Sequence, residues 1–189
     1  VNVLVWGHEI EASDNRVVPL LAGRTDDPLF TSRSVRVGNA TRAWSFVYKA
    51  AAEIGELGDN TKTMRQHILQ DALLRRVVSA KNAQVSVIGH TRWASVGIIS
   101  EPNAHPVTGE EVNKKQPLVL AVLNGDVDNY ADLKVEHDIS VAASITTDAK
   151  VIPSLVARGL QAGQPLQQSF LNAVTQFDGS VAIAALSVD

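Results

Sequence analysis

Four residues of this 189-residue sequence carry groups that together suit a free amino acid with a side-chain amide. Arg92 offers a planar cation that can donate two parallel hydrogen bonds to a carboxylate. Asp148 offers an anion for an ammonium group, and the start of a helix would stabilise it. Asn124 and Gly125 can donate a side-chain N–H and a backbone N–H to one oxygen, as in an oxyanion hole. The four residues therefore predict one amino-acid site.

Each of these residues also has an ordinary structural explanation. A lone arginine after a strand usually forms a surface ion pair, Asn-Gly is a common hairpin turn, and Thr147-Asp148 is a typical helix start. The five histidines lack metal-ligand spacing and no cysteine accompanies them, so His90 and His105 are expected to be structural or to shape a pocket. Trp93 is expected to be a packing residue. Taken one at a time, these residues are therefore better explained by structure, and only their combination favours a ligand site.

The elements that must position these groups are two apolar runs rich in β-branched residues. Residues 85–88 and 118–123 predict strands that are buried on both faces. The first run leads into His90-Thr91-Arg92-Trp93, and the second leads into Asn124-Gly125. Because strand ends are rigid, side chains just beyond them can be held in a fixed geometry.

The sequence before the first of these runs predicts a strand, an irregular region and two helices. Residues 1–6 predict a strand, and residues 8–37 predict a hairpin or loop with short apolar breaks at 17–21 and 34–37. A helix is predicted from Asn39 to a stop at Gly55. A second helix is predicted to begin at Asn60 or Thr61. Its expected apolar face is Met64, Ile68, Ala72 and Leu73, with Arg65, Gln66 and Asp71 elsewhere.

The sequence after the second run predicts two more strands and three more helices. The patterns predict a short helix at 130–134, a strand at 139–145, a helix capped by Thr147 whose first turns Pro153 disturbs, a helix at about 165–177, and a strand at 181–188. Several strands with helices in pairs favour an α+β fold or a layered sandwich over simple βαβ alternation.

Composition and charge argue against several classes of function. The net charge of −3 without long blocks of one sign argues against a nucleic-acid surface. The longest apolar runs are too short to cross a bilayer and follow no leader, so no membrane segment or secretion signal is predicted. The absence of cysteine excludes disulfides and thiolate metal sites and fits a cytoplasmic protein. We expect neither a metal nor a cofactor.

The motifs, in their order, resemble a known family. They are His90-Thr91-Arg92-Trp93-Ala94-Ser95 with Gly97, Asn103-Ala104-His105-Pro106, Leu123-Asn124-Gly125 with Asn129, and Thr147-Asp148 with Val151-Ile152. This set is similar to the class II glutamine amidotransferases, and within them to the glutaminase domain of glutamine–fructose-6-phosphate aminotransferase, or glucosamine-6-phosphate synthase. The resemblance is clear from about residue 85 and weak before it.

The resemblance implies residue roles, a fold and partners. Arg92 would hold the carboxylate of glutamine, Asp148 its amino group, and Asn124 with Gly125 the oxyanion. Three further residues fall where the family shapes or borders its pocket: Trp93, Ser95 and His105. The implied fold is an N-terminal-nucleophile-hydrolase-like αββα sandwich, with two stacked sheets between helical layers, incomplete in residues 1–189. The implied partners are glutamine and a sugar-phosphate isomerase domain in the same polypeptide, and a homo-oligomer is left open.

Two departures from the family's pattern bear on activity. Val96 stands where relatives usually carry a histidine, so one polar contact to the substrate is expected to be lost. The family attacks glutamine with an N-terminal cysteine that serves as its own base, whereas this sequence begins with Val1 and has no cysteine. No G-x-S-x-G nucleophile elbow replaces it. We therefore expect these residues alone not to hydrolyse glutamine.

Three hypotheses follow from the sequence. The first is a piece of a longer amidotransferase whose cysteine lies upstream, with residues 8–37 as an insertion; the only methionine, Met64, is internal. That protein would release ammonia through a thioester and pass it to a domain that binds a ketose phosphate. The second is a degenerate domain that binds glutamine without catalysis or acts as a scaffold. The third is an unrelated α+β domain, which a structure lacking two stacked sheets between helical layers would favour.

Overall fold

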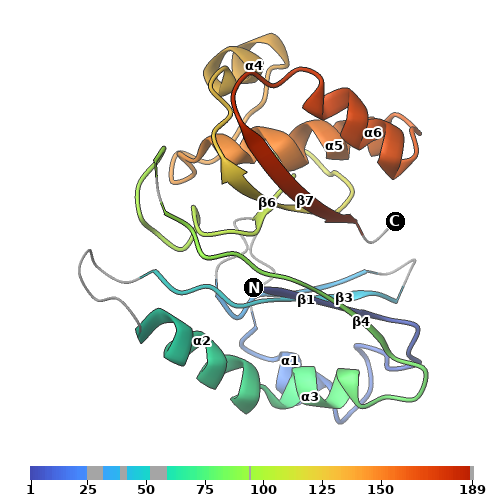
Figure 1. The fold of residues 1–189 in the computed structure, drawn as a ribbon. Helices are drawn as coiled ribbons and strands as arrows, with labels where there is room; N and C mark the ends of the chain where they lie inside the picture. The colour runs from blue at the N-terminus through green and yellow to red at the C-terminus, as the bar shows by residue number, and fades with distance from the viewer. Residues whose placement is uncertain (25–31, 39–41, 52–58, 94, 188–189) are drawn as a thin grey trace.

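Two antiparallel sheets lie face to face in the middle of the molecule, and helices cover the outer face of each (Figure 1). The computed structural model describes residues 1–24, 32–38, 42–51, 59–93 and 95–187. The first sheet has the order β2-β3-β1-β4, formed by β1 (Asn2–Trp6), β2 (Val35–Val37), β3 (Trp44–Val47) and β4 (Gln84–Ile88). The second has the order β5-β6-β7, formed by β5 (Val107–Thr108), β6 (Val119–Gly125) and β7 (Val181–Ser187). The α+β, layered fold class is thus confirmed.

The helices form one layer outside each sheet. On the first sheet lie α1 (Val18–Leu21), α2 (Asp59–Gln70) and α3 (Ala72–Val78). On the second lie α4 (Tyr130–Glu136), α5 (Val151–Gln161) and α6 (Leu166–Val174), and a 3₁₀ turn, Asp148–Lys150, leads into α5. None of the helices in the described part of the chain has the length and apolar character needed to cross a membrane.

Alternation along the first sheet divides its side chains between two apolar cores. Val3 and Val5 of β1 pack with Trp44 and Phe46 of β3 in the core under α3. Val47 faces the other way and packs between the sheets. Because side chains alternate along a strand, odd-numbered residues of β1 face the helices and even-numbered ones face the second sheet.

β6 is the central strand of the second sheet and is buried from Val119 to Leu123. Val119 and Ala121 pack against Ile152 and Val156 of α5, whereas Leu120 packs between the sheets. The predicted burial on both faces is therefore correct for this run. It is wrong for residues 85–88, where the side chains of Val85 and Val87 are 46% and 62% exposed, because β4 is an edge strand.

The predicted helix from Asn39 to Gly55 is wrong in its described part. Residues Trp44–Val47 form β3, which pairs with β1 and β2 along its length. Its helical spacing was coincidental, since the run is aromatic and β-branched and all four residues of the strand are buried. Asn39 and Gly55 lie outside the described residues.

The predicted helix from residue 60 is divided in two by Asp71. This residue, expected on the outer face, is buried; its carboxylate caps α3 at the Leu74 N–H and pairs with Arg24 at 2.7 Å. The irregular region 8–37 contains α1 and β2 at its two apolar breaks. The interpretation of this region as an insertion stays a prediction.

The predicted strand at 139–145 is wrong, since these residues form turns. Their backbone groups bond locally or to the loop after β5: Ser140 N–H donates to Glu111, and Val112 N–H donates to the Ser140 carbonyl. The remaining elements predicted after residue 118 are present with ends shifted by a few residues, and Val188 lies outside the described residues.

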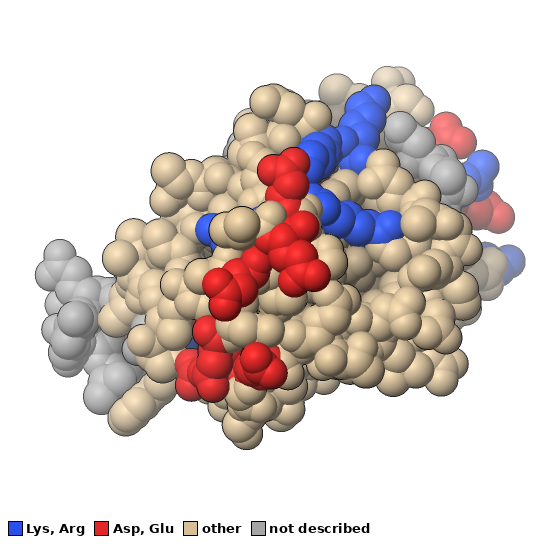
Figure 2. All heavy atoms as spheres, turned by 90° about the horizontal axis from the view of Figure 1, so that it is seen from above, with Lys and Arg blue, Asp and Glu red and all other residues tan. Residues whose placement is uncertain are grey.

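Charged side chains of both signs share the face over the α4–α6 layer. Figure 2 shows acidic side chains gathered in a band next to a group of basic ones. Neither sign covers this face, in keeping with the small net charge of −3.

Candidate functional site

One cavity of about 200 Å³ brings together the residues that the sequence singled out. It lies where the loop after β4, the end of β6 and the 3₁₀ turn before α5 meet. Every predicted site residue is in its wall: Arg92, Trp93, Ser95, His105, Asn124, Gly125 and Asp148. The volume equals roughly six to seven water molecules of bulk liquid, which is the scale of one free amino acid.

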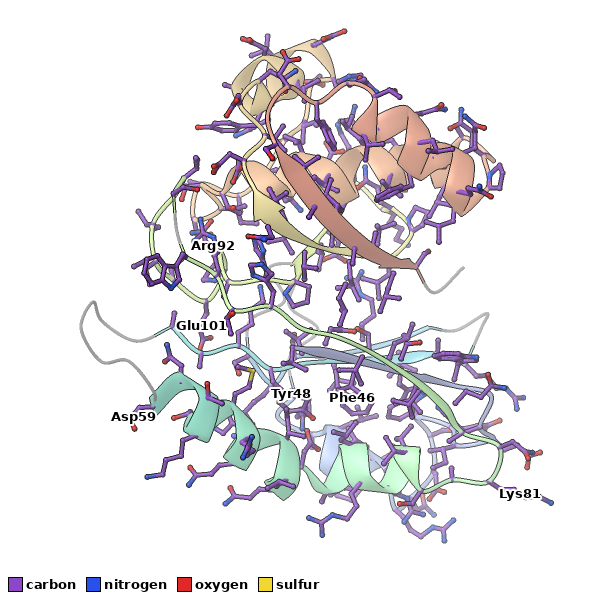
Figure 3. All side chains as sticks on the ribbon, in the orientation of Figure 1. Phe46, Tyr48, Asp59, Lys81, Arg92 and Glu101 are labelled. Atoms are coloured by element: carbon purple, nitrogen blue, oxygen red, sulfur yellow. The ribbon has the colours of Figure 1, made fainter. Side chains whose placement is uncertain are left out.

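Arg92 is half-buried on the loop after β4, at the edge between the two sheets (Figure 3). Nη2 of its guanidinium donates to the Val96 carbonyl, and this hydrogen bond fixes the orientation of the guanidinium plane. Burial lowers the pKa of Arg92, and the nearby Asp148 carboxylate partly offsets this effect. A desolvated guanidinium near a carboxylate can receive a ligand that carries both charges.

Asp148 begins the 3₁₀ turn, and its side chain is buried. One carboxylate oxygen accepts the Val127 N–H at 2.9 Å, and the other accepts the Thr147 hydroxyl at 3.3 Å. The predicted capping of the following helix by the Thr147 side chain is therefore wrong, because that hydroxyl binds the carboxylate instead. Two donors hold the carboxylate in place in the cavity wall.

Asn103 positions the turn that carries Asp148, a role that the sequence did not reveal. Its fully buried side chain accepts the N–H groups of Thr146 and Thr147 at 2.8 and 3.0 Å. It also donates to Ser100 Oγ at 2.8 Å and to the Ser144 carbonyl at 3.0 Å. Its place in the motif Asn103-Ala104-His105-Pro106 was the only signal available.

Asn124 and Gly125 are the last two residues of β6, not residues beyond its end. Asn124, like Leu120, is even-numbered and so faces the space between the sheets. At Gly125 the φ angle is +123°, and a Cβ would lie 1.8 Å from the Ser180 carbonyl oxygen, so only glycine fits.

The register of β6 also directs the Gly125 N–H. Asp126 N–H bonds to the Ser180 carbonyl, so the preceding pair, Gly125 with Val181, is of the non-hydrogen-bonded kind. The Gly125 N–H therefore points away from β7, along the edge that the two-residue β5 does not reach. On this edge, two residues earlier, the Leu123 N–H donates to His105. This direction of the Gly125 N–H is compatible with a role in an oxyanion hole.

His105 is buried, and the hydrogen bond that it accepts fixes its tautomer. Its Nδ1 accepts the Leu123 N–H at 3.3 Å, so the proton of the neutral ring is on Nε2. Burial, with smaller contributions from His90, Arg92 and Lys49, lowers the pKa of His105 to about 3. The ring of His90 lies 4.9 Å away, and neither His105 Nε2 nor His90 Nδ1 has a hydrogen-bond partner.

The loop that follows Arg92 closes one side of the cavity. Trp93 lies at its rim with 92% of its surface exposed, so it does not pack in a core as an isolated tryptophan would. The Ser95 hydroxyl bonds to Asp126 at the end of β6. At Gly97 a Cβ would lie 2.9 Å from Thr146, so the loop lies tightly against the Asp148 turn.

A second cavity, of about 260 Å³, adjoins the first and contains Val1 in its wall. The two cavities share five residues: His90, Thr91, Arg92, Trp93 and His105. Val1 is in register with Tyr48, donating to and accepting from its backbone, and its side chain packs with the core under the helices. In Figure 3, the side chains of Tyr48 and Phe46 point toward the helical layer of the first sheet.

No nucleophilic thiol is present in the sequence. Among the residues that the structure describes, no group of three or more histidines and acids is arranged to hold a metal ion. The chemistry that the described cavity supports is recognition of an amino acid and stabilisation of charge on an amide oxygen. The assignment of each group to a part of the ligand remains a prediction.

Sequence comparison finds similarity to isomerizing glutamine–fructose-6-phosphate aminotransferases. The enzyme of Halalkalibacterium halodurans is 36% identical over 115 residues, which are 61% of this chain and 18% of the relative. That of Gloeobacter violaceus is 41% identical over 104 residues, 54% of this chain and 16% of the relative. That of Oceanobacillus iheyensis is 31% identical over 139 residues, which are 74% of this chain and 22% of the relative. The resemblance derived from the motifs is thus confirmed, and the chain spans about a fifth of the length of these relatives.

No protein-family model matches the sequence. Among solved structures, the allosteric regulatory enzyme of purine biosynthesis has 17% sequence identity to this chain and a TM-score of 0.47. The match covers 100% of this chain and 36% of the chain of that structure. Glutamine phosphoribosylpyrophosphate amidotransferase from B. subtilis, with ADP and GMP, has 17% identity and a TM-score of 0.44, covering 100% and 35%.

Proposed function

We propose that this relative of the glutamine–fructose-6-phosphate aminotransferases is the glutamine-binding and ammonia-releasing part of a class II glutamine amidotransferase. The observation that carries the proposal is the convergence of Arg92, Asp148, Asn124 and Gly125 on one cavity. These residues come from three separate segments, and together they offer a cation, an anion and two amide donors, which are the groups that glutamine needs.

In the proposed complex the α-carboxylate, the α-ammonium and the side-chain amide oxygen of glutamine each have a partner. Arg92 donates to the α-carboxylate and Asp148 accepts from the α-ammonium. The side chain of Asn124 and the backbone N–H of Gly125 donate to the side-chain amide oxygen. The fixed Nε2–H of His105 is a further donor without a partner in the cavity wall.

Hydrolysis of the bound amide would need a thiol that these 189 residues do not contain. A thiolate attacks the amide carbon, Asn124 and Gly125 stabilise the oxyanion, ammonia leaves with an added proton, and water hydrolyses the thioester. Val1 itself is badly placed for this step, because odd-numbered residues of β1 face the helices. By strand alternation, a residue joined to the amine of Val1 would face the second sheet, as Asn124 does.

A second candidate function is a non-catalytic glutamine-binding or scaffold module. The absence of a thiol from these 189 residues, together with Val96 where relatives usually carry a histidine, favours it. The ammonia acceptor, a sugar-phosphate isomerase domain in the same polypeptide, the oligomeric state and a cytoplasmic location remain predictions from the resemblance and the composition.

The binding proposal is tested by calorimetric titration of the 189-residue protein with glutamine. We expect Asp148→Asn to weaken binding at least tenfold, because a charge-assisted contact to the ammonium is lost. Asp132→Asn, an exposed change on α4, serves as the matched control and should bind like the parent. Equal affinity of the parent and Asp148→Asn would refute the assignment of Asp148.

The catalytic proposal is tested by introducing a thiol at either of two neighbouring positions. One variant carries a free N-terminal cysteine joined to Val1, and the other is Val1→Cys. We expect ammonia release from glutamine only in the first, since only there does strand alternation direct the thiol to the face of Asn124. Inactivity of both variants, with glutamine binding retained, would favour the non-catalytic module, and activity of Val1→Cys alone would contradict the facing of β1.

A further inference from the structure

Lys150 is a fully buried lysine on the 3₁₀ turn that begins with Asp148. Only 1% of its surface is exposed, and it does not line the candidate cavity. Its Nζ donates to the carbonyl oxygens of Thr108 and Glu110. Lys150 therefore ties the turn that carries Asp148 to β5 and to the loop that follows β5.

This tie reaches the strand that carries the oxyanion donors. Thr108 pairs with Leu120 of β6, which precedes Asn124 on the strand. The Asp148 carboxylate accepts the N–H of Val127, which follows Asn124 along the chain. The turn is thus attached to the chain on both sides of the oxyanion donors.

Glu110 extends the attachment to the first sheet. Its carboxylate pairs with Arg36 of β2, so the loop that offers a carbonyl to Lys150 is held by both sheets. Without the donors of Lys150, the turn would keep the contacts of Asp148 and Asn103 but lose this rigid support.

We propose that Lys150 is a positioning residue that fixes the distance between the Asp148 carboxylate and the donors of Asn124 and Gly125, and thereby selects glutamine over its shorter homologue asparagine. The two amino acids differ by one methylene between the ammonium group and the amide oxygen. A site with a fixed spacing can satisfy both of these groups in only one of the two ligands. This inference rests on the proposed function and adds a residue that gives the site its selectivity.

The contact needs N–H donors, not a charge. Burial lowers the pKa of Lys150 to about 7, and the nearby Glu111 carboxylate acts against burial. A neutral amine still has two N–H groups, one for each carbonyl. Methionine has a similar length and volume but no N–H, so Lys150→Met removes the donors and keeps most of the packing.

The test measures the affinities of the 189-residue protein for glutamine and asparagine by calorimetric titration. The parent should prefer glutamine by at least about 30-fold, because asparagine is one methylene too short. In Lys150→Met this preference should fall at least fivefold, because the turn can move toward the shorter ligand. Lys115→Met, the same substitution at an exposed lysine, is the matched control and should keep the preference of the parent.

Two further variants separate positioning from packing. Lys150→Leu also lacks donors and should show the same fall in preference if Lys150→Met does not fold. Lys150→Gln offers the two N–H groups of one amide and should recover part of the preference, which a role in packing alone would not produce.

Several outcomes would overturn the inference and leave the proposed function intact. They are an unchanged preference in a folded donor-less variant, an equal loss of affinity for both ligands, a parent that binds both ligands alike, and failure of every Lys150 variant to fold. Absence of glutamine binding to the parent would instead overturn the proposed function, and this inference with it.

Discussion

Two groups of buried polar residues differ in how fully their atoms are paired. The Glu111 carboxylate, with no exposed surface, accepts from Arg158, Lys114, Gln116 and the Ser140 N–H. At the candidate site, by contrast, ring nitrogens of His90 and His105 are buried without a partner. Both groups contain a carboxylate near an arginine.

Under the proposed function, this difference separates a structural cluster from a ligand site. Burial alone would raise the pKa of Glu111, but the hydrogen bonds from Arg158, Lys114, Gln116 and Ser140 outweigh it and lower that pKa to about 2. A buried polar atom without a partner costs roughly 1–3 kcal/mol of stability. Under the proposed function, the two ring nitrogens left unpaired at the cavity are available to a polar ligand.

The largest effect is expected at the structural cluster. Glu111→Gln should lower the free energy of unfolding by about 3 kcal/mol, because the fully buried Glu111 side chain loses the charge that Arg158 and Lys114 pair with. Urea unfolding followed by tryptophan fluorescence measures this change. Glutamine affinity should stay within threefold, and the exposed change Glu136→Gln should alter stability by less than about 0.5 kcal/mol. A large loss of affinity in folded Glu111→Gln would remove the distinction between the two groups.

A nearly equal effect, on binding instead of stability, is expected at Arg92. Arg92→Ala should weaken glutamine at least 100-fold, about 2.7 kcal/mol, because two charge-assisted hydrogen bonds are lost. Calorimetric titration measures it, with thermal unfolding as the control for the fold. Arg92→Lys should recover only part of the affinity, since an ammonium cannot reproduce the planar fork. Unchanged affinity of Arg92→Ala would show that the ligand does not bind in this cavity.

A smaller, mixed effect is expected at Asn103, which supports the site without facing the ligand. Asn103→Ala should cost about 2 kcal/mol of stability, because the N–H groups of Thr146 and Thr147 lose their acceptor. Glutamine binding should weaken about tenfold as the Asp148 turn loosens. Ser100→Ala, which removes only one partner of Asn103, is the milder control. Loss of stability with no change in affinity would show that the turn is held by other contacts.

The smallest effect is expected from His105 in acid. An unfolded chain takes up a proton at histidine near pH 6.5, whereas the folded pKa of His105 is about 3, so acid favours the unfolded state between these values. From pH 7 to pH 5 the parent should lose about 1.9 kcal/mol of stability through this residue. Urea unfolding at both pH values, compared with His105→Gln, measures the difference. The same slope in both proteins would mean that His105 takes up its proton at the same pH in the folded and the unfolded state, so that burial does not lower its pKa.

Sequence patterns predicted the elements well where one element forms a single continuous run. Residues 118–123 and 181–188 read as strands because their β-branched and apolar residues are consecutive, and the structure has β6 and β7 there. The predictions failed where distant partners decide. Residues 44–47 became a strand because β1 and β2 lie on either side of them, and residues 139–145 became turns because Glu111 takes up the Ser140 N–H.

The sequence by itself determined the set of chemical groups and the family that it resembles, since a guanidinium, a carboxylate and an Asn-Gly pair depend only on residue identity. Only the tertiary structure decided that these groups border one cavity, that Val1 faces the helices, and that Asn103 and His105 are locked by backbone N–H groups. The physical reason is that register and strand alternation are set by pairing between segments far apart in the chain, which no local pattern encodes.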